Sequence, residues 1–279
     1  REWRRIFDSY EQPRMAVAEA YLYPTTRLAD YVRPDELHQV FNFDYMGVDW
    51  DAAKIREAIT RSTAELASVG AIPSWVMDNH DSPRVVSRLN SPIKARAFAM
   101  LTHALPGCSY IYQGEELGLT DGIIPDESRQ DPSYIRSGGK DKGRDGARVP
   151  LPWKGSEKNF GFTKGKPWLP MHESLKNFSM DIEDADQSSF LNLYRRSLAL
   201  RKRHAGLGGV EPIQWHDAPE GIIHFSRSSG LVVLANTTDE NIKVNIHEAA
   251  ILLLESGSGA SITGSIVDVP ANTTLWLQT

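Results

Sequence analysis

The 279-residue chain is 41% hydrophobic and 24% charged, which is the composition of an ordinary globular protein rather than a disordered or fibrous one. Its net charge of −5 argues against a nucleic-acid-binding protein, and no apolar run approaches the roughly 20 residues that a membrane-spanning helix needs. The single cysteine, Cys108, excludes an internal disulfide and a thiolate metal cluster. One cysteine is also typical of a cytoplasmic protein.

The first two thirds of the chain alternate short apolar runs with amphipathic segments. In chain order we expect a helix over 1–10, strands over 16–18 and 37–44, a helix over 51–69, a strand over 72–77, a helix over 93–104, a strand over 108–112 and, after a segment rich in proline and glycine, a helix over 187–203. This alternation predicts an α/β domain with parallel strands. Because the strands are uniformly apolar, we expect both of their faces to be covered.

The C-terminal segment has a different texture. Residues 206–279 hold eight acidic and two basic residues, and they are rich in Val, Ile, Thr, Ser and Gly. Short strand-like runs separated by turn residues occur at 221–226, 231–236, 241–246, 250–255 and 272–277. This spacing is typical of an antiparallel β-sandwich. We therefore expect a domain over 1–206 and a second, all-β domain over 207–279.

Acidic residues follow several of the apolar runs, as at Glu19, Asp44 and Asp81. In barrels and open α/β sheets, sites are built at this carboxyl edge of the strands. Glu19 lies near Tyr21 and Tyr23 in the sequence, and a carboxyl group that is poorly solvated beside aromatic rings has a raised pKa and can act as a general acid. The alternative is a glutamate that simply meets solvent at the end of a strand.

The segment 78–84, Asp-Asn-His-Asp-Ser-Pro-Arg, is the most polar stretch directly after a predicted strand. A carboxylate and an imidazole together can hold adjacent sugar hydroxyls. Asn, Asp and Ser also make ordinary turns and helix caps, so a purely structural role is an alternative. A metal site is not expected, because no third ligand is evident near the His80–Asp81 pair.

Four stretches together resemble the α-amylase superfamily of glycoside hydrolases, in its α-glucosidase and oligo-α-glucosidase branch. They are 17–21 (Val-Ala-Glu-Ala-Tyr), 79–84 (Asn-His-Asp-Ser-Pro-Arg), 105–118 (beginning Leu-Pro-Gly and ending Tyr-Gln-Gly-Glu-Glu-Leu-Gly) and 144–153 (Arg-Asp-Gly-Ala-Arg-Val-Pro-Leu-Pro-Trp). The resemblance implies the C-terminal half of a (β/α)8 TIM barrel, strands five to eight, with an insertion at about 118–186. It covers nearly the whole chain.

The resemblance also implies roles for individual residues. Glu19 would be the general acid/base, and Asp81 would stabilise the transition state by holding hydroxyl groups of the glucose ring. His80, Asn79, Tyr21 and Arg144 would bind the same sugar. For Arg144 a salt bridge within its own loop, to Asp141 or Asp145, is the alternative. The adjacent Glu115 and Glu116 are expected to be structural, because neighbours on a strand point to opposite sides. Trp75 and Phe43 are expected to pack in the barrel.

The implied function is that of a retaining α-glucosidase that removes terminal glucose from short α-glucoside oligosaccharides without a metal or other cofactor. Such enzymes need a second carboxylate as nucleophile. The family's nucleophile motif and its first motif are missing from these 279 residues, and the chain opens without Met inside a predicted helix. We therefore expect a fragment that is inactive alone, and that self-associates or pairs with the missing N-terminal half to cover exposed strand edges. A transglycosylase or isomerase on the same fold, and a non-catalytic binding or transport-associated subunit, are the alternatives.

Overall fold

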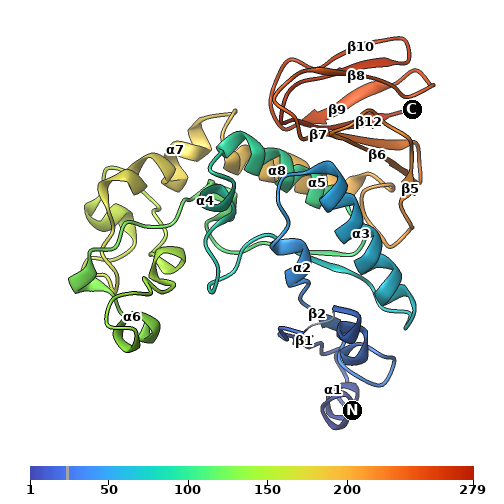
Figure 1. Ribbon diagram of the computed structural model, residues 1–279. Helices are drawn as coiled ribbons and strands as arrows, with labels where there is room; N and C mark the ends of the chain where they lie inside the picture. The colour runs from blue at the N-terminus through green and yellow to red at the C-terminus, as the bar shows by residue number, and fades with distance from the viewer. Residues whose placement is uncertain (23–24) are drawn as a thin grey trace. The chain divides into compact units, whose positions relative to one another are not determined.

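The computed structural model describes residues 1–22 and 25–279, which form two compact units (Figure 1). The first unit comprises Arg1–Val76, Met100–Tyr110 and Leu200–Thr279, and the second comprises Met77–Ala99 and Ile111–Ala199. The chain passes between them four times, after residues 76 and 110 and within helices α5 (Pro92–Ala104) and α8 (Phe190–Arg203), and the sequence predicted both helices.

Short parallel strands form the α/β part of the first unit. Strand β1 (Val17–Ala18) pairs in parallel with β2 (Gln39–Val40), and β3 (Ser74–Val76) pairs in parallel with β4 (Cys108–Tyr110). The hydroxyl of Ser74 on β3 also donates to the carbonyl oxygen of Val40 on β2. The parallel direction predicted from the alternating pattern is thus found in both pairs.

Helices precede and connect these strands. Helix α1 (Glu2–Asp8) opens the chain, a 3-10 segment covers Thr25–Tyr31, and α3 (Ala52–Ala67) fills most of the range predicted at 51–69. Asp51 caps α3, because its Oδ1 accepts a hydrogen bond from the backbone N–H of Lys54 at 2.9 Å. The apolar residues that recur on α3, such as Ile55 and Ile59, are fully buried.

The strand predicted over 37–44 is wrong in its second half. Strand β2 ends at Val40, and helix α2 (Phe43–Met46) begins after Asn42, whose side chain accepts a hydrogen bond from the backbone N–H of Tyr45 at 3.1 Å. The capping asparagine turned an apolar run that looked extended into a helical turn. Asp44 therefore lies on a helix, where it pairs with Arg61, and not at the end of a strand.

The turn between α5 and β4 requires glycine. Gly107 has φ of +92°, and a Cβ atom there would lie 2.1 Å from the carbonyl oxygen of Pro73. The missing side chain allows β4 to pair directly beside β3, as the hydrogen bond from Cys108 N–H to that same Pro73 oxygen shows. Fully buried Trp75, on β3, packs edge-on against Tyr45, in agreement with its predicted role in the core.

The C-terminal part of the first unit consists of antiparallel strands in two layers (Figure 1). One sheet has the order β5-β6-β7-β12-β9 and the other β10-β11-β8. Their bounds are β5 Gln214–Trp215, β6 Ile222–Arg227, β7 Leu231–Asn236, β8 Ile242–Asn245, β9 Ile251–Glu255, β10 Ser261–Thr263, β11 Ile266–Val269 and β12 Thr274–Gln278. Apolar residues of both sheets, among them Leu234 and Val267, form one core cluster. The sequence predicted β6–β9 and β12 and missed β5, β10 and β11.

The second unit is built of short helices and loops. Its elements are α4 (Val85–Leu89), the start of α5, α6 (Pro132–Arg136), α7 (Met180–Ala185), the start of α8, and 3-10 turns at Glu115–Leu117, Asp126–Ser128, Asp145–Arg148, Lys158–Gly161 and Glu173–Phe178. A core cluster that includes Leu119, Val149, Leu169 and Leu175 holds the loops together. Among the described residues, no helix is long and apolar enough to cross a bilayer.

Candidate functional site

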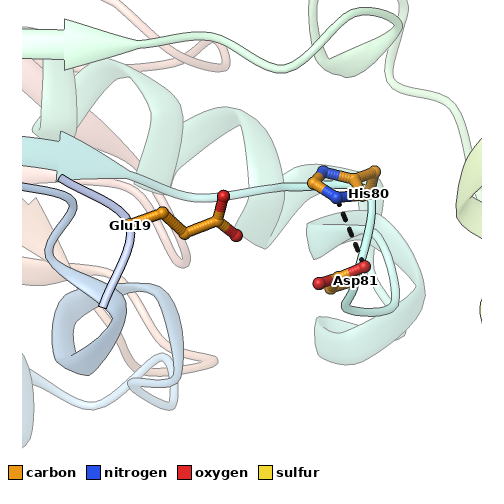
Figure 2. A group of neighbouring side chains, drawn as sticks. All are labelled: Glu19, His80 and Asp81. Carbon is orange, nitrogen blue, oxygen red and sulfur yellow. Dashed lines mark ion pairs between the residues drawn. The ribbon is translucent and has the colours of Figure 1, made fainter. Parts of the chain in front are cut away.

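Glu19 and Tyr21 belong to the first unit, where they follow strand β1. Glu19 is the first residue beyond β1, as the sequence predicted, and its side chain is exposed (Figure 2). The poor solvation expected for this carboxyl group is therefore not found, because the Glu19 side chain is open to solvent. Tyr21 is 61% exposed and stacks on Phe43, with ring centroids 4.3 Å apart. Tyr23 lies outside the described residues.

The segment after β3 presents Asn79, His80 and Asp81 in the second unit. The side-chain oxygen of Asn79 accepts a hydrogen bond from the backbone N–H of Asp81 at 2.9 Å. This asparagine turn directs the next two side chains to one place, so Asn79 positions Asp81. Figure 2 shows the result: the imidazole Nε2 of His80 lies 3.4 Å from Oδ1 of Asp81.

Two arginines from the insertion converge on the same carboxylate. Nη1 of Arg144 and Nη2 of Arg148 each donate a hydrogen bond of 2.8 Å to Oδ1 of Asp81. Nε of Arg148 also donates to the carbonyl oxygen of His80, at 2.8 Å. Oδ2 of Asp81 accepts no hydrogen bond from any described residue, and the side chain is 25% exposed. One carboxylate oxygen is thus fixed by the protein and the other is open to a ligand.

A buried aspartate holds Arg144 in this position. The Asp131 carboxylate accepts hydrogen bonds from the Arg144 side chain at 2.7 Å (Nε) and 3.2 Å (Nη2), and one from its backbone N–H at 2.7 Å. Gly143 makes this close approach possible, because it has φ of +66° and a Cβ there would lie 2.6 Å from the Cβ of Asp131. Asp145 in turn accepts hydrogen bonds from the backbone N–H groups of Gln130 and Asp131, at 2.7 and 3.0 Å.

Arg144 forms ion pairs within the second unit, and its expected contact with the sugar stays a prediction. It pairs within the insertion, although with Asp131 rather than with Asp141 or Asp145, and it also reaches Asp81. The forked guanidinium serves two carboxylates at once, which a lysine could not do in this geometry.

Electrostatics keep the cluster ionised. Partial burial opposes the charge on Asp81, but the hydrogen bond from Arg148 and the charges of His80 and Arg144 outweigh burial, so the pKa of Asp81 lies below its ordinary value. The hydrogen bond from Arg144 is the main reason that the pKa of Asp131 falls well below its ordinary range. At neutral pH both carboxylates are therefore anionic acceptors.

Arg84 is buried and does not enter this cluster. Its guanidinium donates to the carbonyl oxygens of Gln113 and Ala147, each at 3.0 Å, and its backbone N–H donates to Asp121 at 2.9 Å. Arg84 therefore ties the loops of the second unit together behind the exposed segment.

Glu115 and Glu116 are structural, as predicted, but for another reason. They lie on a 3-10 turn rather than on a strand. Glu115 is buried and its Oε1 accepts a 2.8 Å hydrogen bond from the hydroxyl of Tyr194, whereas Glu116 accepts from the backbone N–H of Gly114. Burial, and then the negative charge of Asp78, raise the pKa of Glu115 well above its ordinary range.

Two residues of the cluster around Asp81, namely Asp131 and Arg148, were not among the site residues predicted from the sequence. Asp131 precedes a proline and caps α6 through Ser133 N–H, so locally it reads as an ordinary N-cap. A buried aspartate 13 residues before Arg144 becomes visible only when the loop closes. Arg148 lies one 3-10 turn after Arg144, and this spacing is the signal that could have placed both on Asp81.

Comparison with known proteins agrees with this fold and these motifs. Residues 1–208 match the alpha-amylase family, as its catalytic domain, and the chain therefore belongs to this family. The oligo-1,6-glucosidase of Parageobacillus thermoglucosidasius is 30% identical over 270 residues, which cover 82% of this chain and 46% of that protein. The probable alpha-glucosidase of Rhizobium meliloti is 31% identical over 250 residues, covering 87% of this chain and 44% of the relative.

The solved structure of the alpha-glucosyl transfer enzyme XgtA is similar over the whole chain, with a TM-score of 0.84 and 28% identity, and the match covers 53% of XgtA. The chain thus has the fold of an alpha-amylase catalytic domain. It spans about half the length of the curated relatives that it matches.

Proposed function

We propose that Glu19, His80, Asp81 and Arg144 are the part of an α-glucosidase active site that this chain carries. The observation that supports the proposal most strongly is the state of Asp81. Its carboxylate is ionised, its Oδ1 is fixed by Arg144 and Arg148, and its Oδ2 is open and partly exposed. An oriented anionic acceptor of this kind suits a pair of sugar hydroxyls.

Each residue has a distinct task in the proposed reaction. Asp81 accepts hydrogen bonds from hydroxyl groups of the terminal glucose ring and favours its distorted, oxocarbenium-like form, while His80 hydrogen-bonds the same ring. Arg144 holds Asp81 in place from the insertion. Glu19 protonates the oxygen of the glycosidic bond and then activates water. Tyr21 lies two residues after Glu19 in the sequence. It is exposed and stacks on Phe43, so it offers an aromatic surface to the sugar.

We further propose that β1, β2, β3 and β4 correspond to barrel strands five to eight, and that 1–206 and 207–279 are separate domains. The two parallel strand pairs, the antiparallel sheets of the C-terminal part and the family match over 1–208 support this division. The single cysteine supports a cytoplasmic location.

The 279-residue chain by itself is proposed to be inactive. A retaining glycosidase needs a nucleophilic carboxylate about 5 Å from its acid, and the family's nucleophile motif does not occur in this sequence. The purified chain, incubated with p-nitrophenyl α-glucoside, should release no nitrophenol above a Glu19→Gln control. Robust turnover that Glu19→Gln abolishes would overturn this part of the proposal. Light scattering that shows a compact, stable monomer would overturn the proposed self-association.

Glucosyl transfer is the second candidate, because the structurally similar XgtA is an alpha-glucosyl transfer enzyme. Hydrolysis and transfer share the glucosyl intermediate and differ in whether water or a sugar hydroxyl accepts it. Product analysis of the active assembly on maltose distinguishes the two. Glucose alone indicates a hydrolase, and trisaccharides or isomerised disaccharides at early times indicate a transferase or isomerase.

A further inference from the structure

The insertion contains a polar pocket that is lined by none of Asp81, Asp131, Arg144 and Arg148. Its volume is about 340 Å³, which falls within the size range of small-molecule sites. The lining residues are Glu127, Ser128, Gln130, Asn159, Lys166, Pro167, Trp168, Pro170 and Met171. All of them belong to the second unit. We propose that this pocket binds a glucosyl unit of a neutral oligosaccharide, with the sugar ring stacked on Trp168.

Trp168 is exposed although the backbone around it is fixed. Its side chain is 63% exposed, whereas the next residue, Leu169, is fully buried in the core of the second unit. On the other side, the amide of Asn159 donates to the carbonyl oxygens of Thr163 and Gly165 at 2.9 and 2.7 Å. An indole held in water on an ordered loop offers a flat apolar face without further loss of chain freedom, and the apolar C–H face of a pyranose fits such a surface.

Several polar atoms around the indole are not used by the described part of the protein. Among the described residues, neither the carboxylate of Glu127 nor the ammonium group of Lys166 has an ion-pair or hydrogen-bond partner. The side-chain oxygens of Gln130 and Asn159 accept no hydrogen bond from the same part of the chain. A pocket with one donor cation and three oxygen acceptors beside an aromatic face can satisfy the hydroxyl groups of a sugar.

The charges indicate a neutral ligand. Glu127 and Lys166 cancel, so the pocket does not select an anion or a cation by its field. The loop that brings Gln130 to the pocket also carries Asp131, which binds Arg144. One ordered segment therefore serves the pocket and the Asp81 cluster. The proposed pocket site is separate from the Asp81 site and does not depend on hydrolysis.

Fluorine NMR of the 279-residue chain labelled with 5-fluorotryptophan tests the proposal. The chain has seven tryptophans, and loss of one signal in Trp168→Phe assigns the one of interest. Titration with maltotriose should move the Trp168 signal saturably, with a dissociation constant in the millimolar range. Glu127→Ala combined with Gln130→Ala leaves the indole in place and should weaken binding at least about fivefold, because hydrogen bonds to charged and polar groups are lost.

Trp153→Phe is the matched control, because Trp153 is also exposed, lies in the same unit and does not line the pocket. This variant should bind maltotriose as the parent chain does. Asp81→Asn should leave the Trp168 signal and its titration unchanged, even if the proposed α-glucosidase function is wrong. The proposal is overturned if the Trp168 signal does not move, if the double variant binds as tightly as the parent, or if Asp81→Asn abolishes the shift.

Discussion

Replacing Glu115 with glutamine should make the protein more stable at neutral and alkaline pH. Glu115 is buried, its Oε2 has no hydrogen-bond partner among the described residues, and the negative charge of Asp78 acts on it. Asp78 is itself buried, and its Oδ2 is likewise unpartnered. Two carboxyl groups in one buried region cannot both ionise without a large penalty.

The direction of this change in stability follows from how many protons the folded and unfolded chains bind. Because the folded-state pKa of Glu115 is raised, the native protein holds a proton that the unfolded chain releases above about pH 4.5. The free energy of unfolding therefore falls by about 1.4 kcal/mol for each pH unit above that value, until the folded-state pKa is reached. Glutamine carries no proton to release, so the substitution removes this contribution to the pH dependence. Its carbonyl oxygen can still accept the hydrogen bond of Tyr194.

Asp78 contributes in the same direction over a lower range. Burial raises its pKa to about 6, against the charges of Arg88 and Arg84. Its contribution to stability is complete below its ordinary pKa of 3.8 and is lost as the pH rises towards 6. This part of the slope remains in the Glu115→Gln protein, so the variant should keep a weaker pH dependence below pH 6 and a nearly flat one above it.

Urea unfolding at pH 4.5, 6, 7 and 8 measures the effect. The parent and Glu115→Gln should have similar stability at pH 4.5, and the variant should become increasingly more stable than the parent as the pH rises to 7. Glu116→Gln is the matched control, because the adjacent carboxyl group is not buried, and its pH profile should follow the parent. A Glu115→Gln protein that is less stable than the parent at pH 7, or whose profile is parallel to it, would refute the reasoning.

Three further predictions concern stability. Asp131→Asn should destabilise the chain by about 2 kcal/mol at pH 7, because the charged hydrogen bonds to Arg144 are weakened. Since the pKa of Asp131 is lowered, this difference should be complete above about pH 4 and should shrink progressively as the pH falls from there towards the lower folded-state pKa, so urea unfolding should show a smaller difference at pH 3 than at pH 7. Gly143→Ala should lower the stability by about 1–2 kcal/mol in the same assay, whereas an unchanged value would contradict the close approach to Asp131. Arg227→Met should cost about 3 kcal/mol at any pH from 5 to 8, because the buried guanidinium donates to carbonyl oxygens within 207–211.

Local pattern predicted the elements whose signals lie close together in the sequence. Helices α3 and α8 are amphipathic over their length, and the strands β6, β7 and β12 are nearly continuous buried runs bounded by turns. Short elements were missed or mistaken, because they are too short to show a pattern or because a single capping residue determines whether they are helical. Asn42 converted the end of a predicted strand into α2, and the two-residue β5 has no periodicity to detect.

Residues of the candidate site were likewise predictable only where their signals lie close together in the sequence. Asn79, His80 and Asp81 are consecutive, so the segment after β3 identified them. Asp131 was invisible because its role depends on a loop closure that Gly143 permits, 12 residues further on. The exposure of Glu19 could not be predicted either, because it depends on which side chains cover the end of β1 rather than on the residues next to it in the sequence.

The central claim is that Glu19 and Asp81 of this chain act on an α-glucoside when a nucleophile is supplied. The chain should be co-expressed with the N-terminal part of the Parageobacillus thermoglucosidasius oligo-1,6-glucosidase that precedes the matched region, and the complex isolated by size exclusion. The relative's own matched region serves as the positive control. The complex should hydrolyse p-nitrophenyl α-glucoside, and Glu19→Gln or Asp81→Asn should reduce the rate at least about 100-fold. An intact complex without activity, or activity that neither substitution changes, would contradict the claim.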